Sequence, residues 1–294
     1  MNRTAAPAAW FLGLALAAVA PAGCSSPSST NATTAPGASG PRAAGTITAA
    51  GSTALLPLVK DAAGAYQDAH QNVQISVSGG GSATGINQVA AKAVDIGDSD
   101  ILAAGHPELH DNRVAVIGFA IVTHPGAGVK NLTKQQLRDI FSAKAGNWNQ
   151  LGGPDQKVVV VNRPRSSGTR AVFAKTIMGD TPINESGLTE DATGTAVSVV
   201  KQTPGAISYV ALSGLATGGG AGGVSVVAVD GVAPVPDAIA SGRYPIWSYE
   251  HMYTNGPPRG ETAKFIDFVA HDAALVKKNR FIAIADMKAR ETDR

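Results

Sequence analysis

The stretch Val158–Arg170 reads VVVVNRPRSSGTR: four β-branched residues, then a polar turn, then residues that can open a helix. The segment Val158–Val161 is too uniformly apolar for a strand with one solvent face, so it predicts a strand covered on both faces of a sheet. The next residues bring guanidinium groups, hydroxyls and backbone N–H groups together. Because the first N–H groups of a helix lack intrahelical partners and the helix dipole adds positive charge there, this unit suits a small anion. Helix capping alone is the alternative use of its serines and threonine.

Two more strand–loop–helix units precede this one. Ala50–Ala54 (AGSTA) follows the strand-like Thr46–Thr48 and precedes a helical pattern over Leu55–Tyr66. Val73–Val77 alternates as a strand and runs into Ser78–Gly85 (SGGGSATG), with apolar residues at helical spacing behind it. Together the three units indicate that three helix N-termini converge on one anion.

The pattern from Thr46 onward alternates strands and helices, which predicts an α/β fold with mostly parallel sheets and ligands at the carboxyl ends of the strands. Buried strands are predicted at Val114–Thr123, Ile207–Val210 and Ile246–Tyr253. We expect two lobes, each a mostly parallel sheet flanked by helices, joined by a two-strand hinge with crossings near residues 122–125 and 245–248. Loops from both lobes would face a shared cleft that can close on a ligand.

The N-terminal region has the organisation of an export signal. Arg3 supplies a positive charge, Ala8–Ala20 is an apolar stretch of signal-peptide length, and Pro21–Gly23 provides small residues before Cys24, the one cysteine of the chain. The position of Cys24 resembles a bacterial lipoprotein signal, although leucine is usual where Pro21 stands. The alternative is an ordinary secreted protein with an incidental cysteine.

These patterns divide the chain into four parts. We expect a lipoprotein signal peptide at residues 1–23, with lipid attached to Cys24, and a flexible Ser/Thr/Ala/Pro-rich tether at residues 24–45. Residues 46–123 and 247–294 would form the first lobe, and residues 124–246 the second. The protein would then be extracytoplasmic and anchored to the cell membrane through lipid.

Composition argues against other classes of ligand. The 294 residues carry a net charge of +2 without a basic stripe, so we expect no binding to nucleic acid. Gly218–Gly223 has neither a lysine nor a following helix, which indicates a flexible surface loop and not a nucleotide cradle. His106 and His110 lie four apart, but Pro107 and the lack of a nearby third ligand argue against a metal site. We expect no cofactor and no metal.

The chain resembles the phosphate-binding proteins that serve bacterial phosphate-specific ABC transporters. The similarity runs from Thr46 to about Lys288 and includes the segments LTKQQLRDIFSAKAGNWNQLGG (132–153) and GAISYV (205–210). The resemblance implies a type II periplasmic-binding-protein fold, a monomer without catalytic activity, and delivery of phosphate to the permease subunits of a transporter. It also implies the ligand-binding residues: Thr53, Ala54 through its backbone N–H, Ser82, Asp100 within VDIGDSDI (94–101), Arg163, Ser167, Gly168 and Thr169.

Two positions depart from that family's pattern. The first loop often carries an aromatic residue where Ala54 stands. Some members have an acidic residue, which can pair with the ligand-binding arginine, where this chain has Arg165. A second arginine makes the mouth of the site more basic and leaves open what orients Arg163.

Residue chemistry favours phosphate over other anions. Arg163 can form a bidentate, charge-assisted pair with two phosphate oxygens. Near pH 7 phosphate still carries a proton, which the Asp100 carboxylate can accept, whereas sulfate has none to offer. A helix-capping role fits Asp95 or Asp98 better than it fits Asp100.

Two alternatives stay open. The protein could be a receptor for another oxyanion such as sulfate or molybdate. It could also be an exported hydrolase with Ser167 as the nucleophile, but the sequence contains no G-x-S-x-G elbow and the neighbours of Ser167 include arginines.

Overall fold

A computed structural model describes residues 45–217 and 223–289, and these two ranges fall within one structural unit of the chain. The predicted signal peptide, Cys24, nearly all of the predicted tether and Gly218–Gly222 of the predicted glycine loop lie outside the described residues. Within the described part, no helix combines the length and the hydrophobicity needed to cross a membrane.

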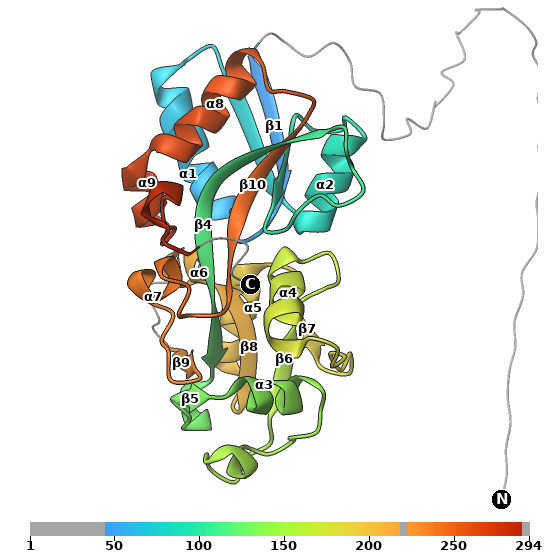
Figure 1. Ribbon diagram of the computed structural model, residues 1–294, viewed down its shortest axis with the longest axis vertical. Helices are drawn as coiled ribbons and strands as arrows, with labels where there is room; N and C mark the ends of the chain where they lie inside the picture. Colours follow the sequence, from blue (N-terminus) through green and yellow to red (C-terminus); the bar gives the residue numbers. More distant parts are fainter. Residues whose placement is uncertain (1–44, 218–222, 290–294) are drawn as a thin grey trace, which may run out of the picture. The chain divides into compact units, whose positions relative to one another are not determined.

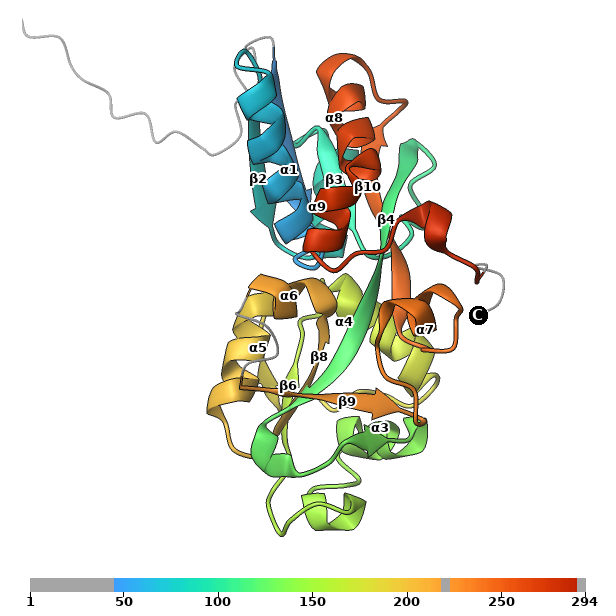
Figure 2. The same ribbon diagram turned by 90° about the vertical axis from the view of Figure 1, so that its left-hand side faces the viewer.

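The first lobe is built on three parallel strands in the order β2-β1-β3. Their bounds are Thr46–Gly51 for β1, Gln74–Gly79 for β2 and Ile96–Ser99 for β3. The helices of this lobe are α1 (Leu56–Ala69), α2 (Ser82–Ala90), α8 (Gly260–His271) and α9 (Ala273–Lys278). Figure 1 shows β1 in the upper half of the picture, with α1, α2 and α8 around it. Figure 2 shows α1, α8 and α9 together over one side of the sheet.

Two long strands, β4 (Leu109–Thr123) and β10 (Trp247–Asn255), connect the lobes and run antiparallel to each other. β4 pairs with β10 over Leu109–Gly118 and then with β8 over Phe119–Thr123. The strand therefore changes partner at residues 118–119. β10 starts at Trp247, within the region predicted for the second crossing.

The second lobe continues the same sheet in the order β4-β8-β6-β7, with β9 paired to β4 and β5 paired to β9. Its strands are β5 (Asn131–Leu132), β6 (Val159–Asn162), β7 (Leu188–Thr189), β8 (Ala206–Ala211) and β9 (Ser225–Val229). Its α-helices are α3 (Lys134–Phe141), α4 (Gly168–Phe173), α5 (Thr193–Gln202), α6 (Leu212–Thr217) and α7 (Pro236–Ala240). A π-helical turn, Ala174–Met178, extends α4, and short 3-10 helices occur at Pro125–Ala127, Trp148–Leu151 and Ile284–Asp286.

Local sequence explains several element boundaries. Pro57 stands in the first turn of α1, where a missing N–H costs nothing. Thr133 and Gln136 form a capping box at the start of α3, as the sequence predicts for Thr133. The parallel pairs of the outer strands fit the expected α/β class, while β4 and β10 add antiparallel pairs at the centre because each must pass between the lobes.

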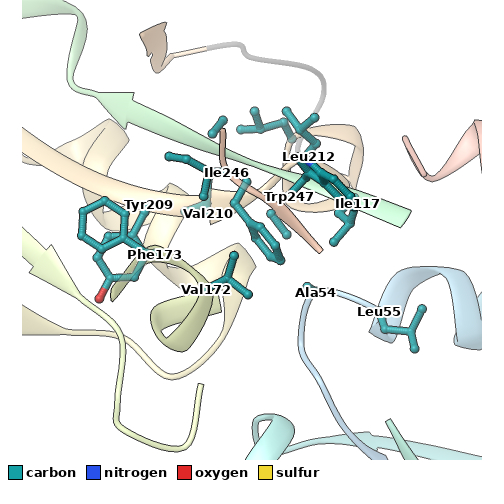
Figure 3. Packing of buried hydrophobic residues seen from close by; sticks show 14 of the residues in the cluster. Ala54, Leu55, Ile117, Val172, Phe173, Tyr209, Val210, Leu212, Ile246 and Trp247 are labelled. Atoms are coloured by element: carbon teal, nitrogen blue, oxygen red, sulfur yellow. The ribbon is translucent and has the colours of Figure 1, made fainter. Parts of the chain in front are cut away.

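One apolar core runs through both lobes. Figure 3 shows Trp247, Ile117 and Leu212 close together, with Leu55 of the first lobe on one side and the second-lobe rings on the other. Those rings are Phe173 and Tyr209, which stack with their centroids 4.2 Å apart. Trp148 is also buried and donates from Nε1 to the Gly205 carbonyl at 2.9 Å, so it packs within the second lobe as expected.

The strand predicted at Val158–Val161 corresponds to β6, but it is only partly covered. Val159 and Val160 are half-buried, whereas Val161 and Asn162 are buried. The reason is that β7, the neighbour on one side of β6, is only two residues long and pairs with its last two residues. The expectation of full cover on both faces is wrong for the first half of this strand.

Candidate functional site

The first lobe contributes polar side chains from the loops that follow β1, β2 and β3. Ser52 and Thr53 stand between β1 and α1, Ser82 is the first residue of α2, and Asp100 directly follows β3. Asp100 is buried; its backbone N–H donates to Ser82 Oγ at 2.9 Å, and its Oδ1 accepts a short hydrogen bond from Ser52 Oγ. Because parallel strands end at the same edge of the sheet, these loops lie together.

The second lobe contributes the loop between β6 and α4. Ser167 caps α4, with its Oγ accepting from the Arg170 N–H at 3.3 Å. Arg163 and Thr169 are buried, with 0% and 1% of their surfaces exposed, which is exceptional for an arginine. The predicted strand, polar loop and helix of Val158–Arg170 are therefore present, with the functional side chains turned inward.

Hydrogen bonds between described residues connect the loops of the two lobes. Thr169 Oγ1 donates to Asp100 Oδ2 at 3.0 Å, and Arg163 Nη2 donates to Thr53 Oγ1 at 2.9 Å. The backbone N–H of Ala83 donates to the Ser166 carbonyl at 3.1 Å. The loops of the three predicted units thus meet in one place, as the sequence predicts.

Backbone carbonyls orient Arg163. Its Nε donates to the Glu190 carbonyl and its Nη2 to the Asp191 carbonyl, at 2.8 and 2.9 Å. Neutral carbonyl groups fix the plane of the guanidinium without cancelling its charge. This answers the question raised by Arg165, whose exposed side chain instead pairs with Glu185 at 3.1 Å.

Two glycines permit the close approach of the loops. A Cβ added at Gly168 would lie 2.2 Å from Ser82 Oγ and 2.8 Å from Asp100 Cβ. Gly81 has φ +92°, and a Cβ there would lie 2.6 Å from the Ser166 carbonyl oxygen. A side chain at either position would force the two lobes apart.

The chain is similar to known proteins over most of its length. The profile of the PBP superfamily domain matches residues 36–273. The phosphate-binding protein PstS of Bacillus subtilis is 40% identical over 255 residues, which cover 84% of this chain and 83% of that protein. This chain belongs to the PstS phosphate-binding protein family.

Two solved structures place the fold in the same family. A substrate-binding protein assigned to a phosphate ABC transporter of Clostridium perfringens, with phosphate bound, matches with a TM-score of 0.75 and 28% identity over 81% of this chain and 99% of that one. An ABC-type phosphate transport receptor from Vibrio cholerae matches with a TM-score of 0.66 and 27% identity over 80% and 99%. The two-lobed α/β fold expected from the PstS resemblance is confirmed.

The electrostatics of these loops centre on Asp100 and Arg163. Burial raises the pKa of Asp100, while hydrogen bonds from Ser52 and Thr169 and the charge of Arg163 act in the opposite direction. Burial lowers the pKa of Arg163, and the negative charge of Asp100 is the largest effect that opposes it. A buried cation and a buried acceptor thus act on each other electrostatically, which is the pairing that a protonated anion requires.

Some predicted ligand residues have other partners in this structure. The Ala54 N–H donates to Ser52 Oγ at 3.0 Å, and Ser82 Oγ accepts from Asp100. The sequence also suggests a capping role for Asp98, and this is wrong: Asp98 lies in β3, and neither carboxylate oxygen has a hydrogen-bond partner among the described residues. Asp95 instead accepts from the N–H and hydroxyl of Thr48, both at 2.8 Å.

Sequence reasoning missed Ser52, Thr193 and Glu250 at this site. Thr193 begins α5 and lies 3.2 Å from Thr53 and 3.5 Å from Arg163 Nη1 through its hydroxyl. A cleft of about 580 Å³ adjoins this point, with Lys60 and Lys278 among its lining residues. Among the described residues, no group of three or more His, Cys, Asp or Glu is arranged to hold a metal ion.

Proposed function

We propose that the protein binds inorganic phosphate between its two lobes and delivers it to the permease subunits of an ABC transporter. The observation that carries this proposal is the buried contact between Asp100 of the first lobe and Thr169 of the second, beside the buried Arg163. A carboxylate in an anion site is useful only if the anion brings a proton. Phosphate does so near neutral pH, and the names of the PstS relatives describe the same ligand.

In this proposal each group has a defined task. The Arg163 guanidinium donates to phosphate oxygens through Nη1, because its Nε and Nη2 hydrogens already go to the Glu190 and Asp191 carbonyls and to Thr53. Asp100 accepts the phosphate proton. The remaining contacts come from hydroxyl and backbone donors of both lobes: Thr53, Ala54, Ser82, Ser167, Gly168 and Thr169.

Capture would require the lobes to open and close. We propose that residues 46–123 with 247–294 move against residues 124–246, with β4 and β10 bending between them. The Lys60 side of the cleft beside Thr53 and Thr193 would then be an entry route for the anion, since lysines attract it.

We also propose that the chain is exported, lipid-anchored at Cys24 and active as a monomer. The short apolar segment before Cys24 and the polar stretch after it support this placement. An exported hydrolase is a weaker proposal, because the Ser167 hydroxyl caps α4 through the Arg170 N–H.

The experiment is a calorimetric titration of residues 46–294, freed of bound anion, with phosphate, sulfate and molybdate near neutral pH. Tight binding of phosphate at one site, with sulfate silent, is the expected result. Equal binding of the three anions would mean that the protein is a general oxyanion receptor. If none of the three bound, the proposal would be overturned. Loss of phosphate binding in Arg163→Ala, with binding kept in Arg165→Ala, would assign the signal to this site.

A further inference from the structure

Two buried carboxyl groups beside Asp100 have no task in phosphate binding as described so far. They belong to Asp98 on β3 and Glu250 on β10, both with 0% of their surface exposed. No hydrogen-bond donor among the described residues reaches any of their four carboxylate oxygens. Ionised carboxylates are rarely buried without donors, so this pair needs an explanation.

The strand register brings both groups to the same face as Asp100. β3 and β10 are antiparallel, with Asp98 opposite Met252 and Ser99 opposite His251. Continued by one residue, this register sets Asp100 opposite Glu250. Because side chains alternate along a strand and paired residues share a face, the three carboxyl groups project from one side of the sheet.

That side of the sheet is the apolar core of the first lobe. Ile96 and Met252, which share the face, belong to the core cluster with Leu58 and Val59 of α1 and Phe265 of α8. Ala115 of β4 stands opposite Glu250. Among the described residues, the charged groups that act on the three carboxyls are these carboxyls themselves and Arg163, which acts on Asp100.

We propose that Glu250 and Asp98 are positioning residues for phosphate recognition: both carry a proton, and Glu250 donates its hydrogen bond to Asp100. The inference rests on the proposed function, since it assigns these residues to the phosphate-accepting carboxylate. Only one of the three groups has hydroxyl donors, Ser52 and Thr169, so Asp100 is the one that holds the negative charge.

The hydrogen bonds of Asp100 explain what this arrangement contributes. Ser52 donates to Oδ1 and Thr169 to Oδ2. With Glu250 donating as well, the carboxylate is held in one orientation for the phosphate proton.

The electrostatics are consistent with this assignment. Burial raises the pKa of Glu250 well above its usual value, and the negative charges of Asp100 and Asp98 and a hydrogen bond to Asp100 raise it further. Burial and the charge of Asp100 likewise raise the pKa of Asp98. Such groups are neutral at low pH and lose their protons only as the pH rises through the raised pKa.

The test compares phosphate binding by the wild type and Glu250→Gln from about pH 5 to about pH 10. Glutamine keeps the shape and donates to Asp100 at every pH, so affinity at low pH should change by no more than about threefold. As wild-type Glu250 ionises, repulsion with Asp100 and the bound anion should lower affinity by at least on the order of tenfold. The variant should lack this loss, whereas the exposed control Glu108→Gln should keep it.

An independent measurement follows the protons themselves. The infrared band of protonated carboxyl groups should be present in the wild type at pH 7 and should weaken in both Glu250→Gln and Asp98→Asn. An unchanged band in both Glu250→Gln and Asp98→Asn would overturn the inference while leaving phosphate binding standing. If the wild type does not bind phosphate, both this inference and the proposed function are overturned.

Discussion

Thr169 Oγ1 of the second lobe donates a hydrogen bond to Asp100 Oδ2 of the first lobe at 3.0 Å, and both side chains are buried. The residue that accepts the phosphate proton in our proposal is therefore also a link between the lobes. Its orientation depends on whether the cleft is closed, so proton recognition and closure are coupled through one carboxylate. A ligand that cannot engage Asp100 would also fail to favour the closed state.

Asp100→Asn should reduce discrimination between phosphate and sulfate. Asparagine presents an N–H donor where the carboxylate accepts, so the phosphate proton loses its acceptor and sulfate loses a repelling charge. A site of this kind can discriminate by up to about 10⁴-fold, and we expect the ratio of affinities to fall by at least about 100-fold. Competition calorimetry at neutral pH measures the ratio of the phosphate and sulfate affinities.

The matched control for that change is Asp68→Asn, an exposed aspartate on α1. It removes the same charge from the chain without touching the site. If the control and Asp100→Asn gave the same phosphate-to-sulfate ratio as the wild type, Asp100 would have no role in selecting the anion.

Arg163→Lys should weaken phosphate binding while keeping the positive charge. Lysine cannot reproduce the planar fork that the Glu190 and Asp191 carbonyl groups hold in place. With hydrogen bonds to charged groups contributing about 1.5–3 kcal/mol each, we expect a loss of roughly tenfold to 100-fold, and a larger loss for Arg163→Ala. Arg165→Lys is the control, because 84% of the Arg165 side chain is exposed. A comparable loss of affinity in this variant would indicate that phosphate binds near Arg165 and not at the buried Arg163.

Gly168→Ala should prevent the cleft from closing. The added Cβ would lie 2.2 Å from Ser82 Oγ, and the Asp100 side chain blocks its other side. We expect phosphate affinity to fall at least about tenfold, because the loops must separate in the bound state and lose contacts with the anion. Small-angle X-ray scattering with excess phosphate should show a more open particle than the wild type.

Gly194→Ala provides the comparison for this change. Gly194 lies in the first turn of α5, and a Cβ there has no heavy atom within 4 Å. It should leave both affinity and scattering unchanged. If Gly168→Ala closed as far as the wild type does, the Ser82 and Asp100 side chains would be able to move away from the added Cβ, and the prediction would be wrong.

Local sequence predicts the loops of the site because each one combines a strand end, small residues and a helix start. The Val158–Arg170 unit and the loops with Thr53 and Ser82 are recognisable in this way. Prediction fails where tertiary pairing decides the structure. Residues 109–113 are largely polar and suggest no strand, yet they pair with β10 and extend β4. Glu250 lies on a strand that the sequence predicts, but no local signal shows that β10 sets it opposite Asp100.

Asp98→Asn should make the stability of the protein less sensitive to a rise in pH above about 4. Burial and Asp100 raise the folded-state pKa of Asp98, so above the ordinary aspartate pKa the unfolded chain is ionised while the folded protein keeps the proton. The folded state then binds more protons than the unfolded state, and the free energy of unfolding falls as the pH rises. The largest slope for one such group is about 1.4 kcal/mol per pH unit.

Asparagine does not titrate, so the variant should lose this slope and should be more stable relative to the wild type at pH 7 than at pH 4. Urea unfolding at intervals from about pH 4 to about pH 8 measures the difference. Asp68→Asn controls for the removal of a charge from an exposed position. Parallel stability curves for Asp98→Asn and the wild type would mean that Asp98 ionises in the folded protein as readily as in the unfolded chain, and its burial would then need a counter-charge.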